Sequence, residues 1–469
     1  MFTSLIFIII SALRLAKPEL TGFYYDQGRD ALVIWDLIKN GKMFLIGPTT
    51  GVEGVFLGPG FYYLIAPFYW LGRGNPVWPI QFLAILNIFG LFLLYKLGEK
   101  YFSKGAGLLA MIFAGFSYHN LMANRWLSNP NPLTLTSIVI FGLLIKLIQG
   151  EKKWFALICF LIGFSLHFEA ASAVFFLPAT LIILIVFFKS IKMDVKNFIL
   201  GGLAFGLTLV PQLWFNFRHD NILFKAFQSF LASSPPTIVQ SRLEFYFDTF
   251  TKHFTLTSVE WRWVFVLILI VGLIKGFKGL WQNNFFKLAL IWVLTPVLTL
   301  LLYTGNHGYV WGYYFTGIFP IVYLLVGSIF ATFLGYKYGI IILFFIVLTI
   351  VYSNIPAIKY YFYEDEGAIT LGRTLTVVDW IADDAGGRLF NVDVYVPPVI
   401  PYAYDYLFKW QAVQPSTQNV ELLYTPYEPD GPHPERLELW LARQNGIGKF
   451  ESETKLGPIT IQKRSRLLW

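Results

Sequence analysis

The chain has 469 residues, of which 56% are hydrophobic and only 14% are charged, and its mean hydropathy is +0.58. A soluble domain carries roughly 25% charged residues, so this composition excludes a cytosolic enzyme and a disordered protein. The net charge of +8 indicates membrane orientation rather than nucleic-acid binding, because basic residues beside apolar segments usually mark the cytoplasmic side and no basic domain is present.

Eleven apolar segments predict membrane-spanning helices, since about 20 apolar residues cross roughly 30 Å of hydrocarbon. They lie near residues 2–16, 76–96, 105–122, 131–149, 153–167, 170–188, 197–217, 261–280, 285–303, 313–334 and 338–355. The first lacks the basic start and the cleavage site of a signal peptide, and we interpret it as a membrane anchor. Residues 1–356 are therefore expected to form an α-helical polytopic membrane module with about eleven transmembrane helices.

Lysine clusters in alternate connections predict the orientation of the chain. These clusters are Lys96, Lys100 and Lys104; Lys146, Lys152 and Lys153; Lys189, Lys192 and Lys196; and Lys275, Lys278 and Lys287. Because cytoplasmic loops are rich in Lys and Arg, we expect a cell-membrane protein with a cytoplasmic N-terminus and an extracytoplasmic C-terminal domain. Arg14 and Lys17 conflict with this orientation, since they follow the first span on the predicted external side.

The first external loop, residues 17–75, contains a predicted surface helix. Asp26 is the predicted N-cap, and Asn40 with Gly41 is the predicted end of the helix. Apolar residues recur between them at helical spacing, at Val33, Ile34, Leu37 and Ile38. This pattern indicates an amphipathic helix on the membrane surface, with Asp26, Arg29 and Asp30 on one face.

A second aromatic stretch, residues 58–70, is too short and too interrupted to span the membrane. Its aromatic side chains suit the lipid headgroup region. They form either an anchoring belt or a wall on which a lipid-linked substrate or a sugar ring stacks.

The layout resembles a known family of enzymes. A first span, an aromatic-Asp-Gln-x-Arg helix beginning at Tyr25, a Gly-Pro-x-x-Tyr-Tyr stretch at residues 58–63, many further spans and an external tail follow one another. This order is similar to glycosyltransferase family 39 and its bacterial relatives, the protein O-mannosyltransferases and lipid A aminoarabinose transferases of the GT-C superfamily. The likeness covers nearly the whole chain in layout, and its sharp motif lies within about residues 24–63.

The resemblance implies a GT-C-like fold and transfer of a sugar from a polyprenyl-phosphate carrier to an acceptor on the outer membrane face, with no metal and no other cofactor. It places the catalytic Asp at Asp26 and the following basic residue at Arg29. Gln27 stands where the family commonly has Glu. Gly58 and Pro59 stand where relatives often have paired prolines.

The chemistry of transfer favours these residue types. Attack by a hydroxyl requires a proton acceptor, which a carboxylate such as Asp26 provides. The leaving phosphate gains negative charge, and the planar donors of Arg29 suit its oxygens. The alternatives are that Asp26 only caps the helix and that Arg29 only contacts lipid headgroups. Asp30 is either part of the site or a salt-bridge partner.

Further external residues are candidates for the same site. Arg125 is a lone cation in an external loop, either a second donor-phosphate contact or a headgroup contact. His167 and Glu169 interrupt an apolar run and are either site residues or an outer turn between two short helices. The full set of predicted substrate-binding residues is Tyr25, Gln27, Asp30, Pro59, Tyr62, Tyr63, His167, Glu169 and His307. The six histidines show no metal-ligand spacing.

Residues 357–469 are predicted to form a small soluble α/β domain. From Lys359 onward, 11 Lys and Arg face 15 Asp and Glu, a net charge of −4, against +12 for the rest of the chain. Helices are expected at 368–385, 403–410 and 434–445, and strands at 388–396, 421–424 and 458–462.

The sequence therefore predicts a membrane glycosyltransferase that inverts the configuration of the transferred sugar, with Asp26 as the base. Its expected partners are a lipid-linked sugar donor, a hydroxyl-bearing acceptor on protein, lipid or glycan, and membrane lipids. The alternative is a polytopic transporter or lipid-linked sugar flippase without transferase chemistry. That alternative predicts ionisable groups at the membrane centre and an internal repeat, whereas the polar candidates gather on one side.

Overall fold

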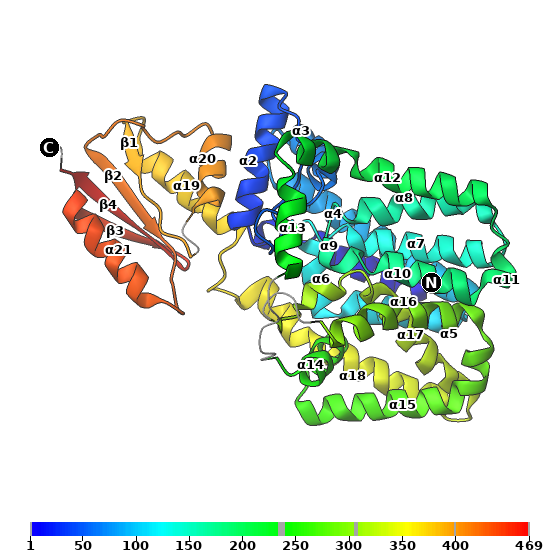
Figure 1. Ribbon diagram of the computed structural model, residues 1–469. Helices are drawn as coiled ribbons and strands as arrows, with labels where there is room; N and C mark the ends of the chain where they lie inside the picture. Colours follow the sequence, from blue (N-terminus) through cyan, green and yellow to red (C-terminus); the bar gives the residue numbers. More distant parts are fainter. Residues whose placement is uncertain (1, 233–239, 304–307, 398–399, 468–469) are drawn as a thin grey trace.

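The computed structural model describes residues 2–232, 240–303, 308–397 and 400–467. Figure 1 shows a body of roughly parallel helices and a smaller C-terminal α/β part that follows helix α18 (Gly339–Lys359). Helix α2 (Tyr25–Asn40) lies between these two parts and runs across the ends of the body helices. The predicted helix is thus present, and its position at the membrane surface stays a prediction.

Every apolar segment singled out in the sequence contains helix. The body helices are α1 (Phe2–Leu15), α4 (Val77–Tyr101), α5 (Lys104–Phe116), α6 (Tyr118–Arg125), α7 (Leu133–Ile148), α8 (Phe155–Ser165), α9 (Ala170–Ala173), α10 (Phe176–Val186), α11 (Phe188–Ile191), α12 (Val195–Arg218), α15 (Val259–Gln282), α16 (Asn284–Leu301), α17 (Phe319–Ala331) and α18. Helices α13 (Ile222–Ala232) and α14 (Arg242–Lys252) lie in the long connection between α12 and α15.

Within the described residues, five helices are long and apolar enough to cross a membrane: α4, α12, α15, α16 and α18. The pair α5 and α6 adds a sixth if its 70° bend divides one broken span. Helices α12 and α15 bury only 11% and 6% of their most apolar windows, so their apolar side chains face outward as lipid-facing side chains do. The chain has the character of a membrane protein, while the number of eleven crossings stays a prediction.

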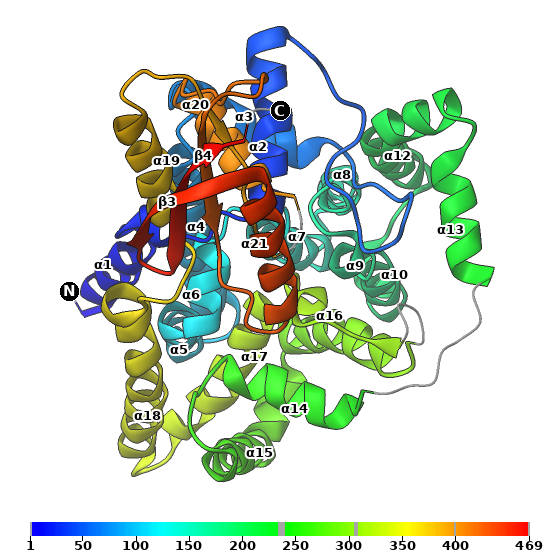
Figure 2. The same ribbon diagram turned by 90° about the vertical axis from the view of Figure 1, so that its left-hand side faces the viewer.

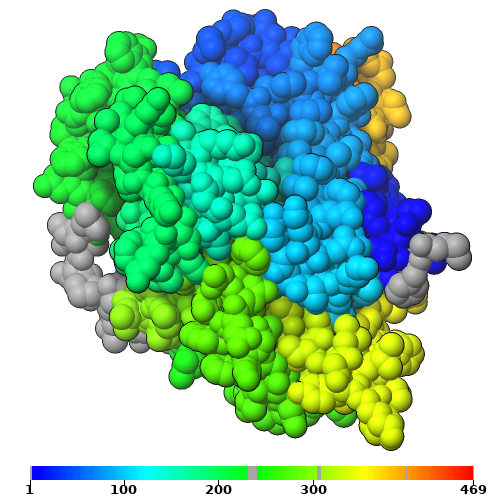
Figure 3. Space-filling model, turned by 90° about the vertical axis from the view of Figure 1, so that its right-hand side faces the viewer, coloured from blue at the N-terminus to red at the C-terminus, as the bar shows by residue number. Residues whose placement is uncertain are grey.

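The lysine-rich connections lie away from the C-terminal part. Figure 1 places α11, which carries Lys189, at the end of the body opposite α2, and Figure 3 shows the molecule from that side. This arrangement fits the predicted grouping of the connections. Which side of the membrane each end faces stays a prediction.

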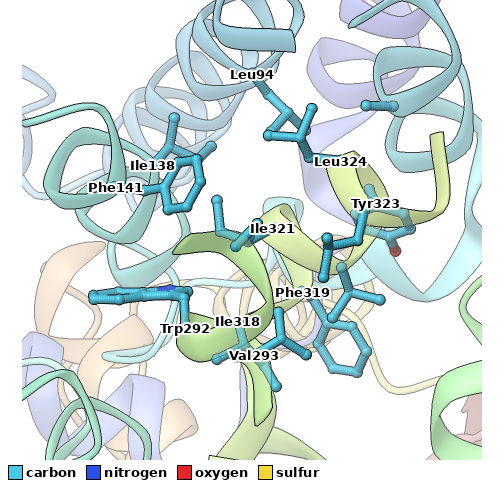
Figure 4. Packing of buried hydrophobic residues seen from close by; sticks show 14 of the residues in the cluster. Leu94, Ile138, Phe141, Trp292, Val293, Ile318, Phe319, Ile321, Tyr323 and Leu324 are labelled. Carbon is cyan, nitrogen blue, oxygen red and sulfur yellow. The ribbon is translucent and has the colours of Figure 1, made fainter. Parts of the chain in front are cut away.

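Helix α17 forms the centre of the body. Residues 319–330 are all buried, and the helix contacts α5, α7, α15 and α16. Figure 4 shows Ile321 of α17 among the apolar side chains of neighbouring helices, with Trp292 of α16 close by. Trp292 stacks on Phe176 with 4.7 Å between ring centroids. Because full burial of one large apolar side chain stabilises by roughly 1.5–3 kcal/mol, this cluster fixes the arrangement of the body helices.

The C-terminal part is a four-stranded sheet with three helices, seen from the side of the sheet in Figure 2. The strand order is β1 (Phe390–Val392), β2 (Leu422–Tyr427), β4 (Ile459–Arg466), β3 (Gly448–Leu456), with β1 and β2 parallel and the other pairs antiparallel. The helices are α19 (Leu371–Ala385), α20 (Tyr402–Trp410) and α21 (Pro434–Ile447). All six predicted elements are found.

Strand β3 was not predicted from the sequence. It is an edge strand whose side chains are mostly exposed, so it has no apolar alternation. The Gly457-Pro458 pair was the signal that could have revealed it, because Gly-Pro pairs mark turns. In the structure this turn joins β3 to β4, and Gly457 has φ +61°.

The C-terminal part and the surface helices share one hydrophobic core. This core joins residues of α2, α4, α19, α20, β2 and β4 with those of α3 (Gly60–Leu71). The backbones come close at Gly28 of α2, where an added Cβ would lie 2.3 Å from the backbone of Tyr402 and Ala403 at the start of α20. The C-terminal part is therefore seated directly on the helix that carries the candidate site.

Candidate active site

Helix α2 begins two residues earlier than the predicted cap at Asp26 indicated. Tyr24 has extended backbone angles and is the N-cap, and its N–H donates to Oε1 of Gln27 at 3.1 Å. Gly41 ends the helix with φ +63°, as predicted. The prediction that Asp26 caps the helix was wrong, because Gln27 reaches back to the cap residue and Asp26 lies within the first turn. There its charge is favourable, since helix N-termini attract anions.

Asp26, Arg29 and Asp30 lie together on one face of α2, as their spacing predicted. Nη1 of Arg29 is 2.9 Å from Oδ1 of Asp26, while its Nη2 and Nε lie 2.8 and 3.0 Å from Oδ1 of Asp30. The two carboxylates differ sharply in environment. The side chain of Asp26 is 61% exposed, whereas that of Asp30 is 8% exposed.

Asp30 anchors Arg29 from within the protein. It also accepts a hydrogen bond of 3.0 Å from the Tyr62 hydroxyl on α3. Burial raises the pKa of the Asp30 carboxyl to about 6, with the positive charge of Arg29 opposing that shift. Nη1 of Arg29, which pairs with Asp26, also donates to Oγ1 of Thr49 at 3.0 Å. Thr49 was not singled out in the sequence, because its contact with Arg29 depends on the path of the loop between α2 and α3.

His167 fixes the start of α3 and is buried. Its Nδ1 accepts from the N–H of Gly60 at 3.1 Å, and its Nε2 lies 2.8 Å from the carbonyl of Thr208 on α12, so Nε2 carries the proton. An added Cβ at Gly58 or Gly60 would come within 3 Å of this ring. Pro59, the N-cap of α3, lies between these two glycines. The geometry gives His167 a structural role and does not bring its ring to Asp26.

The aromatic residues of α3 are mostly inside the protein. Tyr62 is buried beneath α2, and the Tyr63 hydroxyl bonds both the N–H and the carbonyl of Phe44 at 2.9 Å. Tyr25 packs on Tyr402 of α20, with 4.9 Å between ring centroids. These side chains join α2, its following loop and α20, and they do not form an open stacking wall.

Arg125 lies at the end of α1 rather than at the candidate site. Its side chain is buried, and it donates to the carbonyls of Leu13, Arg14, Ala16 and Lys17 at 2.6–3.0 Å. Arg125 therefore caps the last turn of α1, which leaves its carbonyls without partners in the helix. This geometry does not fit the predicted contact with a donor phosphate.

The orientation conflict at Arg14 also has a structural explanation. Its side chain is buried and donates to the carbonyls of Ile10, Ala114 and Gly115 and to Oδ1 of Asn124. Because four oxygens inside the protein bind this guanidinium, Arg14 does not contact lipid headgroups and is not an indicator of which side of the membrane it lies on.

Glu169 lies in the turn between α8 and α9. Its side chain accepts from the N–H of Ala171 at 3.1 Å, and burial raises its pKa to about 7. The break in the apolar run is thus a turn between two short helices, and its outer location and any site role of Glu169 stay predictions. His307 lies outside the described residues. Among the described residues, no group of three or more His, Cys, Asp and Glu side chains lies together as metal ligands, and metal-independent action stays a prediction.

Comparison with known proteins gives a family match for one part of the chain. Residues 57–215 match the family described as dolichyl-phosphate-mannose-protein mannosyltransferase. This segment runs from the start of α3 to the end of α12 and does not include Asp26. No curated protein sequence matches the chain.

Solved structures match the chain over nearly its full length. ArnT from Cupriavidus metallidurans aligns in the apo state and bound to undecaprenyl phosphate, each with a TM-score of 0.62, at 11% and 10% identity. These alignments cover 98% of this chain and 97% and 98% of ArnT. The Archaeoglobus fulgidus oligosaccharyltransferase in the apo form aligns with a TM-score of 0.53 at 11% identity, over 86% of this chain and 63% of that one.

At these identities the structural likeness shows the fold. The chain has the GT-C-like fold of ArnT and the oligosaccharyltransferase, and the family match of residues 57–215 confirms the resemblance to the family 39-like mannosyltransferases.

Proposed function

We propose that the chain is a membrane glycosyltransferase that moves a sugar from a polyprenyl-phosphate carrier to a hydroxyl acceptor. The observation that carries this proposal is the exposed carboxylate of Asp26, held by Arg29 on a helix that lies across the ends of the body helices. The family match and the fold support it. One of the similar structures, ArnT, is bound to undecaprenyl phosphate, which is the kind of lipid that such a reaction releases.

In the proposed reaction, Asp26 accepts the proton of the acceptor hydroxyl. The acceptor oxygen forms a bond to the anomeric carbon on one face, while the bond from that carbon to the phosphate oxygen breaks on the other. The leaving polyprenyl phosphate keeps the electron pair, so the configuration at the anomeric carbon is inverted. Because the Asp26 side chain is 61% exposed, it then returns the proton to water.

Arg29 is proposed to serve both the base and the donor. Its Nε and Nη2 are held by Asp30, which fixes the plane of the guanidinium. Its Nη1 faces Asp26 and Thr49 at the surface and is the edge that a donor phosphate can share. The remaining predicted contacts, Tyr25, Gln27, Pro59, Tyr62 and Tyr63, are proposed to hold α2 and α3 in place rather than to contact the sugar.

The proposed reaction takes place on the outer face of the cell membrane, because the lysine-rich connections lie at the far end of the body from α2. Sidedness is measured with a membrane-impermeant maleimide. Cys159 is the single cysteine, so Cys159→Ala removes background labelling, and Thr49→Cys or Lys192→Cys is then added. We expect labelling of residue 49 in intact cells and of residue 192 only after lysis. The opposite pattern refutes the outer-face assignment.

The catalytic proposal is tested with Asp26→Asn in the full chain reconstituted in lipid vesicles. Mass spectrometry measures polyprenyl phosphate released and sugar gained by the acceptor. We expect turnover to fall by about 10²–10⁴-fold, the usual contribution of a general base. Stability changes little, since an exposed ion pair contributes about 0–1 kcal/mol.

Asp36→Asn is the matched control, because Asp36 lies on the same helix and pairs with Lys409 on α20 at 3.6 Å. It is expected to keep full turnover. Unchanged sugar transfer by Asp26→Asn refutes the assignment of the base. Movement of lipid-linked sugar across sealed vesicles, without a new glycosidic bond in the unaltered chain, refutes the transferase proposal itself.

A further inference from the structure

A cavity lies toward the C-terminal end of α2, away from Asp26. It has a volume of about 300 Å³ and is lined by Trp35, Ile38, Lys39, Tyr69, Trp70, Arg73, Gly74 and Tyr406. Lys39 is 13 residues beyond Asp26, which places it about 20 Å along the helix at about 1.5 Å per residue. The cavity is therefore separate from the candidate active site.

The walls of this cavity are aromatic and rigid. Tyr406 makes edge-on contacts with Trp35 and Tyr69, with ring centroids 6.1 and 6.0 Å apart. Tyr69 and Tyr406 are both buried. These three rings come from α2, α3 and α20, so the cavity sits where the C-terminal part meets the surface helices.

The loop at residues 73–74 is held in a demanding conformation. Arg73 has φ +52°, a left-handed value that non-glycine residues rarely adopt. Nε1 of Trp410 donates to the carbonyl of Arg73 at 3.1 Å, and the Tyr406 hydroxyl donates to the carbonyl of Gly74 at 2.5 Å. A Cβ at Gly74 would lie 2.6 Å from Trp410. These contacts place the Arg73 side chain at the rim of the cavity.

Two cations at this rim have no anionic partner. Neither Lys39 nor Arg73 forms an ion pair within the described residues, although ten or more ion pairs occur elsewhere in the chain. Lys39 lies over the ring of Trp35 at 5.1 Å instead. Beside them, Trp70 and Leu71 are 65% and 52% exposed, which is the pattern of a segment at the membrane–water boundary.

We propose that this cavity binds the phosphate of a phospholipid headgroup. Lys39 and Arg73 hold the phosphate oxygens, the glycerol lies against Trp35, and the acyl chains leave past Trp70 and Leu71. Such a lipid joins α2, α3 and α20 at their common junction, so it strengthens the seat of the C-terminal part on the membrane module. The site is independent of the sugar-transfer chemistry at Asp26.

The experiment measures lipid binding to the purified full chain by native mass spectrometry. The probes are phosphatidylglycerol, phosphatidylcholine and water-soluble glycerol 3-phosphate. We expect phosphatidylglycerol to bind, and Lys39→Gln or Arg73→Gln each to weaken it about tenfold, since one charged hydrogen bond contributes about 1.5 kcal/mol. Lys39→Arg, which keeps the charge, is expected to retain binding within about threefold of the unaltered chain.

Lys42→Gln is the matched control, because Lys42 follows the same helix but does not line the cavity. Lys42→Gln is expected to leave phosphatidylglycerol binding unchanged. If it weakens binding as much as Lys39→Gln does, the lipid is attracted by the general positive charge and not by this cavity, and the proposal is refuted. Lys39→Gln does not involve the left-handed backbone at Arg73, so it tests the site even if Arg73→Gln folds poorly. Unchanged phosphatidylglycerol binding in Lys39→Gln overturns the proposal. If glycerol 3-phosphate binds as tightly as phosphatidylglycerol, the cavity recognises a soluble phosphate, and the proposal of a lipid ligand is overturned.

Discussion

The close contact at Gly28 allows a direct test of how α2 holds the C-terminal part. An added Cβ at this position would lie 2.3 Å from the Tyr402 carbonyl carbon and the Ala403 nitrogen, and 2.5 Å from the Tyr402 oxygen. Ordinary Cβ contacts lie at 3.4–4 Å and contacts under 3.0 Å essentially never occur, and all three neighbours are backbone atoms that cannot rotate away. Gly28→Ala therefore forces α2 and α20 apart by about 1 Å.

The expected cost follows from two opposing effects. Overpacking of a tight contact destabilises by about 1–3 kcal/mol, while replacing Gly by Ala within a helix stabilises by about 0.5–1 kcal/mol. The net loss of about 1–2 kcal/mol falls on the contact between α2 and α20. It raises the population of molecules with an undocked C-terminal part by about 5–30-fold.

Limited proteolysis of the full chain measures this population, because cleavage between α18 and α19 follows local opening. We expect Gly28→Ala to be cleaved about 5–30-fold faster than the unaltered chain. Gly202→Ala on α12 is the control, since nothing lies within 4 Å of the Cβ added there. An unchanged cleavage rate in Gly28→Ala contradicts the docked arrangement of α2 and α20.

Three further predictions concern buried polar groups. Because burial raises the pKa of Asp30 to about 6, its carboxyl binds a proton more tightly in the folded chain than in the unfolded chain. The free energy of unfolding therefore falls as pH rises from about 4 to 6. Thermal unfolding of Asp30→Asn is expected to lack this fall. His167→Ala leaves the Gly60 N–H and the Thr208 carbonyl unpaired and is expected to cost about 3 kcal/mol in thermal unfolding; no change in melting temperature means that the ring does not hold α3. Arg125→Gln is expected to lower the melting temperature at unchanged donor affinity, and a stable variant with weakened donor binding would restore its predicted phosphate contact.

Much of the fold is readable from the sequence because its signals are local. Apolar runs, helical spacing and turn residues predicted α2, the apolar body helices and six of the seven elements of the C-terminal part. The shared face of Asp26, Arg29 and Asp30 follows from helical periodicity alone. Strand β3 escaped because an edge strand with exposed polar side chains has no apolar pattern.

The roles of single polar residues were harder to predict, since their partners are distant in the sequence. His167 meets Gly60, 107 positions away, and Arg125 meets Leu13, 112 positions away. The sequence shows that each is a polar group among apolar neighbours, which is equally true of a substrate contact and of a buried cap. Only the three-dimensional path of the chain separates these two roles.

The same distinction between a structural role and a substrate contact explains why Asp26, and not Asp30, remains the candidate base. Asp30 is buried, and its Oδ1 accepts from the Tyr62 hydroxyl and from two nitrogens of Arg29, so this oxygen is committed to the fold. Within the described residues, Asp26 pairs only with the Nη1 edge of the same guanidinium, and most of its side chain is open to solvent. A base must reach a substrate proton and still be positioned by its surroundings. On this face of α2, Asp30 holds Arg29 in position, Arg29 in turn positions Asp26, and the exposed carboxylate of Asp26 is open to a substrate.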